Sequence, residues 1–343
     1  MHQFESHADD LVSWMTPWVP EANQLRQLCD LPSLPKRQVE TLDRLDVSVP
    51  GRKWRQIQEF AAAQPPSTLT ALEWCAGKGH LGRLLAKVDG CHVISLEWQE
   101  QLCEHGQQLA DKTGATQQFV CADAFDNKVG EHLHTAGRAI ALHACGDLHV
   151  ELMHHWVQRG GRYLALSPCC YHLIRTPDYR ALSQMGQGAK VCLSRDDLKL
   201  ALQETVTASA GDRRRRQREL MWRLSFDEWQ RMQRGVNEYL PTPSIRNSDL
   251  SGRFEDFCRK QAHFKQVPWQ TGFEPEYWLE QGRKRLWALR RMELVTHLFR
   301  RPLETWLVLD RAHYLEEQGA QVTVGTFCEH SLTPRNIMIL AEQ

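Results

Sequence analysis

The sequence predicts an α/β fold, in which a doubly wound, Rossmann-like sheet ends in a C-terminal antiparallel hairpin and carries a helical insertion. Five short apolar runs recur about every 20–25 residues between 69 and 167, the spacing of one strand plus one crossover helix. This rhythm stops over 195–300. Two further strand candidates close the chain, and the link between them is too short for a crossover helix.

Four segments follow from this pattern. Residues 1–65 are expected to form an N-terminal helical segment, in which Trp54, Ile57 and Phe60 share one face of a helix over 51–63. The core is expected over 66–194, with five parallel strands at 69–74, 92–97, 117–122, 138–144 and 162–167. Residues 195–300 are expected to form a helical insertion that recognises the substrate. Residues 301–343 carry a last helix that starts near Pro302 and ends before Gly319, followed by hairpin strands at 321–328 and 336–343.

The overall charge is balanced, with 42 basic and 42 acidic residues among 343. No global field therefore steers the protein toward nucleic acid or a membrane, and any such patch must be local. The eleven cysteines include no CxxC pair, which is typical of reduced thiols rather than of a disulfide framework. Without a signal peptide or an apolar run of membrane-spanning length, we expect a cytoplasmic protein that does not contact membranes.

A glycine-rich turn after the first strand predicts a cofactor site. Gly77, Gly79 and Gly82 let the backbone approach a ligand closely at the start of a helix. Glu97 ends the second strand, where a carboxylate can accept both hydroxyl hydrogens of a ribose. Asp123 follows the third strand, in position to accept from an adenine amino group. These acidic residues suit an adenosine with free ribose hydroxyls, a feature that NAD shares.

The acidic residue before the glycines and the closing hairpin resemble the class I S-adenosylmethionine methyltransferases, over about 68–195 and 300–343. By this resemblance Glu73 matches the acidic residue of the first motif, Glu97 the ribose-binding acid and Asp123 the adenine-side acid. Cys75 departs from the motif, whose commonest form has glycine there. The resemblance implies S-adenosyl-L-methionine as cofactor. Glu73, Gly77, Gly79, Gly82, Glu97, Asp123 and His143 are the expected cofactor-binding residues.

Polar and thiol side chains crowd the ends of the fourth and fifth strands, where ligands bind in a doubly wound sheet. The turns "CGD" at Cys145–Asp147 and "CCYH" at Cys169–His172 resemble a narrower group of methyltransferases. That group includes the methyltransferase domain of the glutathione-S-transferase-C-terminal-domain-containing protein and, more distantly, a eukaryotic tRNA 2'-O-methyltransferase. We expect the catalytic residues to be among Asp147, Cys170, Tyr171 and His172.

Three interpretations of this rim remain open. In the first, His172 or Asp147 acts as a general base and removes the proton of the methyl acceptor while the methyl group transfers in line. In the second, Cys169, Cys170 and His172 bind a metal with Cys145 or His143. We expect no metal, because the side chains of adjacent cysteines tend to diverge. In the third, Cys169 and Cys170 simply pack under the cofactor, and His172 forms a hydrogen bond with the backbone.

The insertion is rich in arginine and tryptophan. Arginines bind phosphates and aromatic rings stack on unpaired bases, so we expect RNA to bind through Arg213, Arg214, Arg215, Arg216, Arg290 and Arg291. Leu286, Leu289, Met292 and Phe299 would form one apolar helix face beside them. A solvated helix on a helical cap explains the same residues. The leading expectation is methyl transfer to RNA; a protein or small-molecule methyltransferase and a non-catalytic cofactor-binding module are the alternatives.

Overall fold

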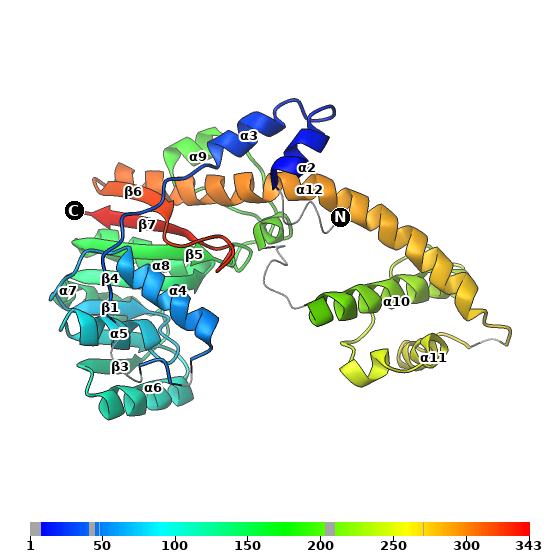
Figure 1. Ribbon diagram of the computed structural model, residues 1–343, viewed down its shortest axis with the longest axis horizontal. Coiled ribbons are helices and arrows are strands. Elements are labelled where there is room, and N and C mark those ends of the chain that lie inside the picture. The colour runs from blue at the N-terminus through cyan, green and yellow to red at the C-terminus, as the bar shows by residue number, and fades with distance from the viewer. Residues whose placement is uncertain (1–7, 41–44, 48, 203–209, 270) are drawn as a thin grey trace. The chain divides into compact units, whose positions relative to one another are not determined.

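The computed structural model describes residues 8–40, 45–47, 49–202, 210–269 and 271–343. Its elements divide into two compact units, one of residues 12–204 and 299–343 and a smaller one of 1–11 and 205–298 (Figure 1). Most of the predicted insertion, 195–300, falls in the smaller unit. Among the described residues, no helix is both long and apolar enough to cross a membrane.

A seven-stranded sheet organises the larger unit, in the order β3-β2-β1-β4-β5-β7-β6. The first five strands are parallel, and β7 is antiparallel to both β5 and β6. The predicted strands and the closing hairpin are therefore confirmed. The strands are β1 (Ala71–Trp74), β2 (Val93–Glu97), β3 (Gln117–Cys121), β4 (Arg138–Cys145), β5 (Tyr163–Cys169), β6 (Gln321–Thr326) and β7 (Ile337–Glu342).

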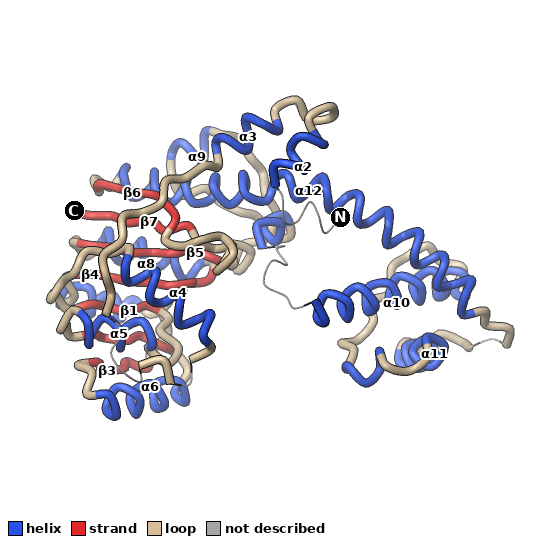
Figure 2. Tube along the Cα trace, in the orientation of Figure 1, coloured by secondary structure: helices blue, strands red, loops and turns tan. Residues whose placement is uncertain are grey.

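Helices flank the strands of this sheet (Figure 2). Apart from the last helix, those wholly within the larger unit are α3 (Ala22–Leu28), α4 (Gly51–Ala62), α5 (His80–Val88), α6 (Glu100–Thr113), α7 (Glu131–Thr135), α8 (Asp147–Gln158) and α9 (Gln184–Gly188). The first helix, α2 (Ala8–Met15), is divided between the two units after Leu11. Short 3-10 turns occur at η1 (Asn127–Gly130) and η2 (Asp197–Leu202). The predicted helix over 51–63 is confirmed, because α4 buries Trp54, Ile57 and Phe60.

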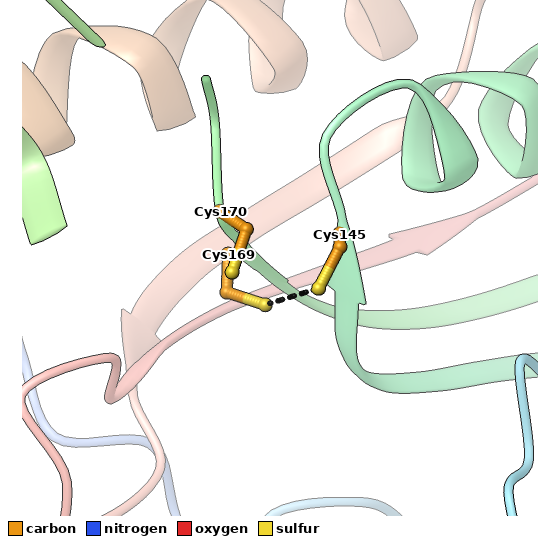
Figure 3. A group of neighbouring side chains, drawn as sticks. All are labelled: Cys145, Cys169 and Cys170. Atoms are coloured by element: carbon orange, nitrogen blue, oxygen red, sulfur yellow. Dashed lines mark hydrogen bonds between the residues drawn. The ribbon is translucent and has the colours of Figure 1, made fainter. Parts of the chain in front are cut away.

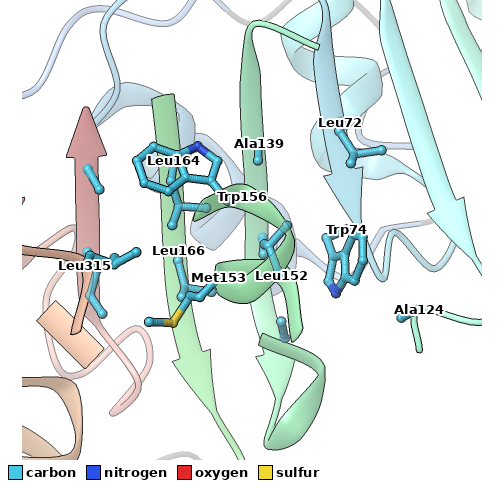
Figure 4. Packing of buried hydrophobic residues seen from close by; sticks show 14 of the residues in the cluster. Leu72, Trp74, Ala124, Ala139, Leu152, Met153, Trp156, Leu164, Leu166 and Leu315 are labelled. Atoms are coloured by element: carbon cyan, nitrogen blue, oxygen red, sulfur yellow. The ribbon is translucent and has the colours of Figure 1, made fainter. Parts of the chain in front are cut away.

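Two apolar cores lie on the two faces of the sheet, as the alternation of side chains along a strand requires. Leu72 packs in the core that α8 and the end of α12 (Pro275–Glu317) cover, whereas its neighbour Ala71 packs beneath α4 and α5. Trp156 of α8 is fully buried in the first core, near Met153 and Leu166 (Figure 4). Packing on both faces fixes the five parallel strands, so their carboxyl ends lie together along one edge of the sheet.

The last helix is longer than predicted. We expected it to start near Pro302, but α12 begins at Pro275 and contains Pro302 in its interior. Proline lacks the N–H that would bond to Leu298, at a cost of about 3 kcal/mol. Leu307 and Val308 are fully buried beyond it, and their burial offsets that cost. The predicted end is confirmed, since Gly319 follows the helix at φ 90.

Aromatic side chains form the core of the smaller unit, which contains α10 (Ala210–Arg234), η3 (Asn247–Leu250), α11 (Phe254–Phe264) and part of α12. Trp222, Trp229 and Trp278 are buried there, as expected for a helical unit with its own core. The predicted apolar face on 286–299 is wrong in part. Leu286 is buried, but Met292 is 59% exposed and Phe299 is 36% exposed.

Candidate active site

A cavity of about 670 Å³ opens at the carboxyl ends of the parallel strands. This volume lies within the range of pockets that hold small-molecule cofactors. Its wall is built from the segments that follow each strand: Cys75 after β1, Leu96–Gln99 at the end of β2, Ala122–Phe125 after β3, His143, Cys145, Asp147 and Leu148 around the end of β4, and Leu173–Arg175 after β5. The predicted Glu97, Asp123, His143 and Asp147 all line it.

Glu97 is held rigidly in this wall. One carboxylate oxygen accepts from the Gly77 N–H at 2.9 Å, and the other accepts from the Gln99 N–H at 3.1 Å. Only 6% of the residue is exposed. A carboxylate oxygen can accept more than one hydrogen bond, so both oxygens keep capacity for a pair of neighbouring hydroxyl groups. This geometry fits the predicted contact with a ribose.

Asp123 and two aromatic side chains form the adjoining part of the wall. The Asp123 carboxylate accepts from the Phe125 N–H at 3.0 Å through one oxygen. The guanidinium carbon of Arg175 lies 3.4 Å from the centroid of the Phe125 ring. Trp98 also lines the cavity and is 70% exposed. This part of the wall therefore offers the planar side chains of Trp98 and Phe125, and the acceptor oxygens of Asp123, to a flat apolar ring system.

Glu73 and the glycines lie behind the cavity rather than in its wall. Gly79 begins α5 at φ 62, a left-handed conformation that glycine adopts without strain. At Gly82 a Cβ would lie 2.4 Å from the Glu73 carboxylate, so this glycine lets α5 pack against β1. Glu73 is buried and accepts from the Ser95 hydroxyl at 2.7 Å. Glu73 therefore does not line the cavity, and its effect on a bound cofactor would come through the packing of β1 against α5.

Burial away from water raises the pKa of Glu73 to about 7, against the opposing hydrogen bond from Ser95. Because its pKa in the folded state exceeds that of an exposed carboxyl, the folded protein loses stability as pH rises from about 4.5 to 7. Glu73→Gln removes this loss. We therefore expect the free energy of unfolding of Glu73→Gln, minus that of the natural protein, to increase by up to about 3 kcal/mol between pH 5 and pH 8. Urea unfolding at both pH values measures it; a pH-independent difference would contradict the burial of an ionisable Glu73.

His143 sits at an irregularity of β4. The register with β5 shifts between Leu142 and Ala144, and His143 adopts φ 62. Its Nε2 lies 3.1 Å from Gln56 Oε1, while Gln56 Nε2 donates to the Leu332 carbonyl at 3.0 Å. The second bond fixes the amide orientation, so His143 donates through Nε2 and keeps a lone pair on Nδ1. Burial, and then the charge of Arg335, lowers the pKa of His143 to about 4.

The turn after β4 positions Asp147. Gly146 N–H donates to the Cys169 carbonyl at 3.0 Å, and Asp147 N–H donates to the Leu173 carbonyl at 3.0 Å. The Asp147 carboxylate accepts in turn from the Arg175 N–H at 2.7 Å. The turn after β4 is therefore bonded to the loop after β5, and the carboxylate is fixed in the cavity wall.

Three thiols gather where β4 and β5 end. Cys145 and Cys169 are register partners whose sulfurs lie 3.6 Å apart, and the sulfur of Cys170 lies beside them (Figure 3). Cys145 lines the cavity, whereas Cys170 is absent from its wall. Hydrogen bonds from the thiols of Cys145 and Cys169 hold the pKa of Cys170 well below its usual range.

Three of the four predicted catalytic residues lie outside the cavity wall, namely Cys170, Tyr171 and His172. Tyr171 is fully buried in the core under α8, where its ring lies edge-on to His149 and its hydroxyl donates to the Pro168 carbonyl at 3.4 Å. Its bulk and apolar ring place it in the core instead of at the rim, so we withdraw its catalytic assignment. His172 is half-buried and does not line the cavity; its Nδ1 is buried with no hydrogen-bond partner.

The structure adds residues that the sequence did not indicate. Gln56 reaches His143 from a helix 87 residues earlier in the chain. Arg175 contributes its N–H to Asp147 and its guanidinium to Phe125. No local motif marks either residue, because each acts through a contact that only the fold creates. Trp98 could have been found, since it directly follows Glu97 at a predicted strand end.

Two comparisons with known sequences agree with this geometry. Residues 52–177 match a family model described as a methyltransferase domain. A glutathione S-transferase C-terminal domain-containing protein of Xenopus laevis is 30% identical over 130 residues. The match covers 36% of this chain and 20% of the relative, so the chain spans about a fifth of that protein's length.

Solved structures show weaker likeness. The tRNA (uracil-54, C5)-methyltransferase of Pyrococcus abyssi, in complex with S-adenosyl-L-homocysteine, is 17% identical, with 33% of this chain and 26% of that chain covered and a TM-score of 0.26. A SAM-dependent methyltransferase from Aquifex aeolicus is 15% identical, with 42% and 70% covered and a TM-score of 0.26. These scores are too low to carry an inference, so the fold assignment depends on the strand order itself.

Proposed function

We propose that residues 52–177, which match a methyltransferase domain model, form a class I S-adenosylmethionine-dependent methyltransferase domain, and that the protein transfers a methyl group from this cofactor to RNA. The cavity that Glu97 lines at the strand ends carries the methyltransferase part of the proposal. The RNA part is supported by a basic hollow and an aromatic hollow in the smaller unit.

The residues of the cavity fit S-adenosylmethionine. Glu97 offers two oxygens of a fixed carboxylate to the ribose hydroxyls, and Asp123 offers an acceptor to the adenine amino group. Trp98 and Phe125 supply flat apolar surfaces for the purine. When bound, the cofactor supplies an electrophilic methyl group. The protein's own task is to hold the acceptor in line with that methyl group and to exclude water.

Methylation of an oxygen or a nitrogen releases the proton that the acceptor atom carried. Asp147 is a suitable base, because the Arg175 N–H fixes its carboxylate in the cavity wall. His143 also lines the cavity and has an Nδ1 lone pair, which gives a second acceptor for that proton or for the cofactor's amino group. His172 and Cys170 lie outside the cavity wall, so we assign neither the role of base.

A basic hollow near the start of α10 supports binding of a phosphate chain. It has a volume of about 290 Å³ and is lined by Arg214, Arg215 and Arg218 together with Leu250 and Ser251. Arg218 donates to the Leu250 carbonyl at 3.2 Å, which fixes its guanidinium at the edge of the hollow. Guanidinium groups match phosphate oxygens in charge and geometry. Arg216 is exposed on the same helix.

An aromatic hollow near the end of α10 supports binding of an unpaired base. Its volume is about 370 Å³; Tyr277, which is 51% exposed, lines it together with Phe273 and with the edges of the mostly buried Trp229 and Trp278. Gln233 also lines it, and the buried Oε1 of this residue has no hydrogen-bond partner. Aromatic rings that stack on a base beside an amide that reads its edge are the usual means of recognising single-stranded RNA.

Reversing charge in the basic segment tests the RNA proposal. We expect Arg214→Glu with Arg216→Glu to weaken binding of total RNA at least about tenfold and to reduce its dependence on salt. The control pair Arg253→Glu with Lys284→Glu changes the charge of the same unit equally at two other exposed positions. Equal RNA affinity and salt dependence in the two pairs, measured by filter binding, would contradict the proposal.

A further inference from the structure

The three thiols at the ends of β4 and β5 have the arrangement of a metal site. Their sulfurs all lie within 4.8 Å of one another, and the Cys145 and Cys169 sulfurs are 3.6 Å apart (Figure 3). Zinc–sulfur bonds of about 2.3 Å in a tetrahedron place two sulfurs about 3.8 Å apart. The cluster therefore already has close to the spacing that one ion imposes on its ligands.

The backbone explains how two adjacent cysteines meet at one point. Successive side chains of an extended strand point to opposite faces, which was our reason for expecting no metal. Cys170 leaves the strand in a left-handed conformation, φ 47, and this brings its sulfur to the sulfurs of Cys169 and Cys145. Such a backbone costs a residue other than glycine about 1–3 kcal/mol and is concentrated at functional sites.

His172 provides a second, independent observation. It follows Cys170 by two residues, and its buried Nδ1 has no hydrogen-bond partner. A buried polar atom without a partner costs about 1–3 kcal/mol, so an unpaired imidazole nitrogen two residues after the last of the three cysteines calls for an explanation. Three cysteines and one histidine are a common ligand set for structural zinc.

We propose that Cys145, Cys169 and Cys170 bind one Zn²⁺ as thiolates, and that His172 rotates to supply the fourth ligand. Binding releases the thiol protons and forms three Zn–S bonds and one Zn–N bond, with no change of oxidation state. The ion ties the end of β4 to the end of β5. Because Cys145 also lines the cofactor cavity, the ion fixes one part of that cavity's wall.

Metal analysis of the full-length protein, purified in reducing buffer without chelator, tests the site. We expect one equivalent of zinc per chain. Cys145→Ser and Cys169→Ser should each lower zinc affinity at least about 100-fold, and His172→Ala at least about tenfold. Cys192→Ser is the matched control, because Cys192 is an exposed free cysteine outside the cluster. Unchanged zinc affinity in Cys145→Ser or Cys169→Ser would overturn the thiolate site, and unchanged affinity in His172→Ala would overturn the fourth ligand.

Cobalt substitution decides the question even if a serine variant fails to fold. Titrating Co²⁺ into the metal-free natural protein should produce a thiolate-to-cobalt charge-transfer band with the intensity of three thiolates, together with the visible bands of a tetrahedral ion. Zinc at background level together with no thiolate-to-cobalt band would overturn the proposal. Neither measurement depends on RNA or on methyl transfer.

Discussion

Glu97→Ala should lower the affinity for S-adenosylhomocysteine at least about 100-fold. The carboxylate offers charge-assisted hydrogen bonds to two hydroxyl groups, and each such bond contributes about 1.5–3 kcal/mol. The substitution also leaves the N–H groups of Gly77 and Gln99 without their acceptor, which loosens the turn against the cavity. Isothermal titration calorimetry measures the change.

Two further variants make this result specific. Glu97→Gln keeps the size and the hydrogen-bonding oxygen but loses the charge, so its affinity should fall less than that of Glu97→Ala. Glu100→Ala removes an exposed carboxylate at the start of α6 and should bind like the natural protein. If Glu97→Ala bound S-adenosylhomocysteine as tightly as Glu100→Ala, the cofactor would not lie over Glu97.

Gly146→Ala should destabilise the protein by about 3 kcal/mol or more and abolish methyl transfer. Gly146 adopts φ 52 and ψ -129, a conformation that residues with a Cβ avoid. A Cβ there would lie 2.1 Å from the Leu173 carbonyl oxygen, so the two bonded turns must separate. Separation frees Asp147 from its contacts with Leu173 and Arg175.

Thermal unfolding and labelled methyl transfer measure the two effects of Gly146→Ala. Gly188→Ala serves as the control, because no atom lies within 4 Å of the position that its Cβ would take. We expect the control to change stability by less than about 0.5 kcal/mol. Equal melting temperatures and activities in the two variants would show that the turn between β4 and α8 does not position the base.

The sequence predicted the sheet well because parallel strands are buried on both faces. All four residues of β1 are buried, and the strand begins with the apolar Ala71 and Leu72 before Glu73 and Trp74. The acids at the ends of β2 and β3 followed from the same reasoning, since parallel strands present their carboxyl ends along one edge. Glu97 and Asp123 accordingly line one cavity.

Side-chain direction after a strand could not be predicted in the same way. Cys170, Tyr171 and His172 are consecutive, yet their side chains lie in the thiol cluster, in the core and outside the cavity wall. The left-handed backbone at Cys170 decides this distribution, and cysteine carries no preference that would reveal it. The continuation of α12 through Pro302 likewise depends on tertiary packing that overrides a local helix breaker.

Labelled methyl transfer tests the central claim most directly. The full-length protein is incubated with extract from cells lacking it and with S-adenosylmethionine labelled in its methyl group, and the product is divided between ribonuclease and protease. We predict that ribonuclease releases the label and that protease leaves it in place. Release by protease alone would contradict the RNA assignment, and no incorporation while S-adenosylhomocysteine still binds would contradict methyl transfer itself.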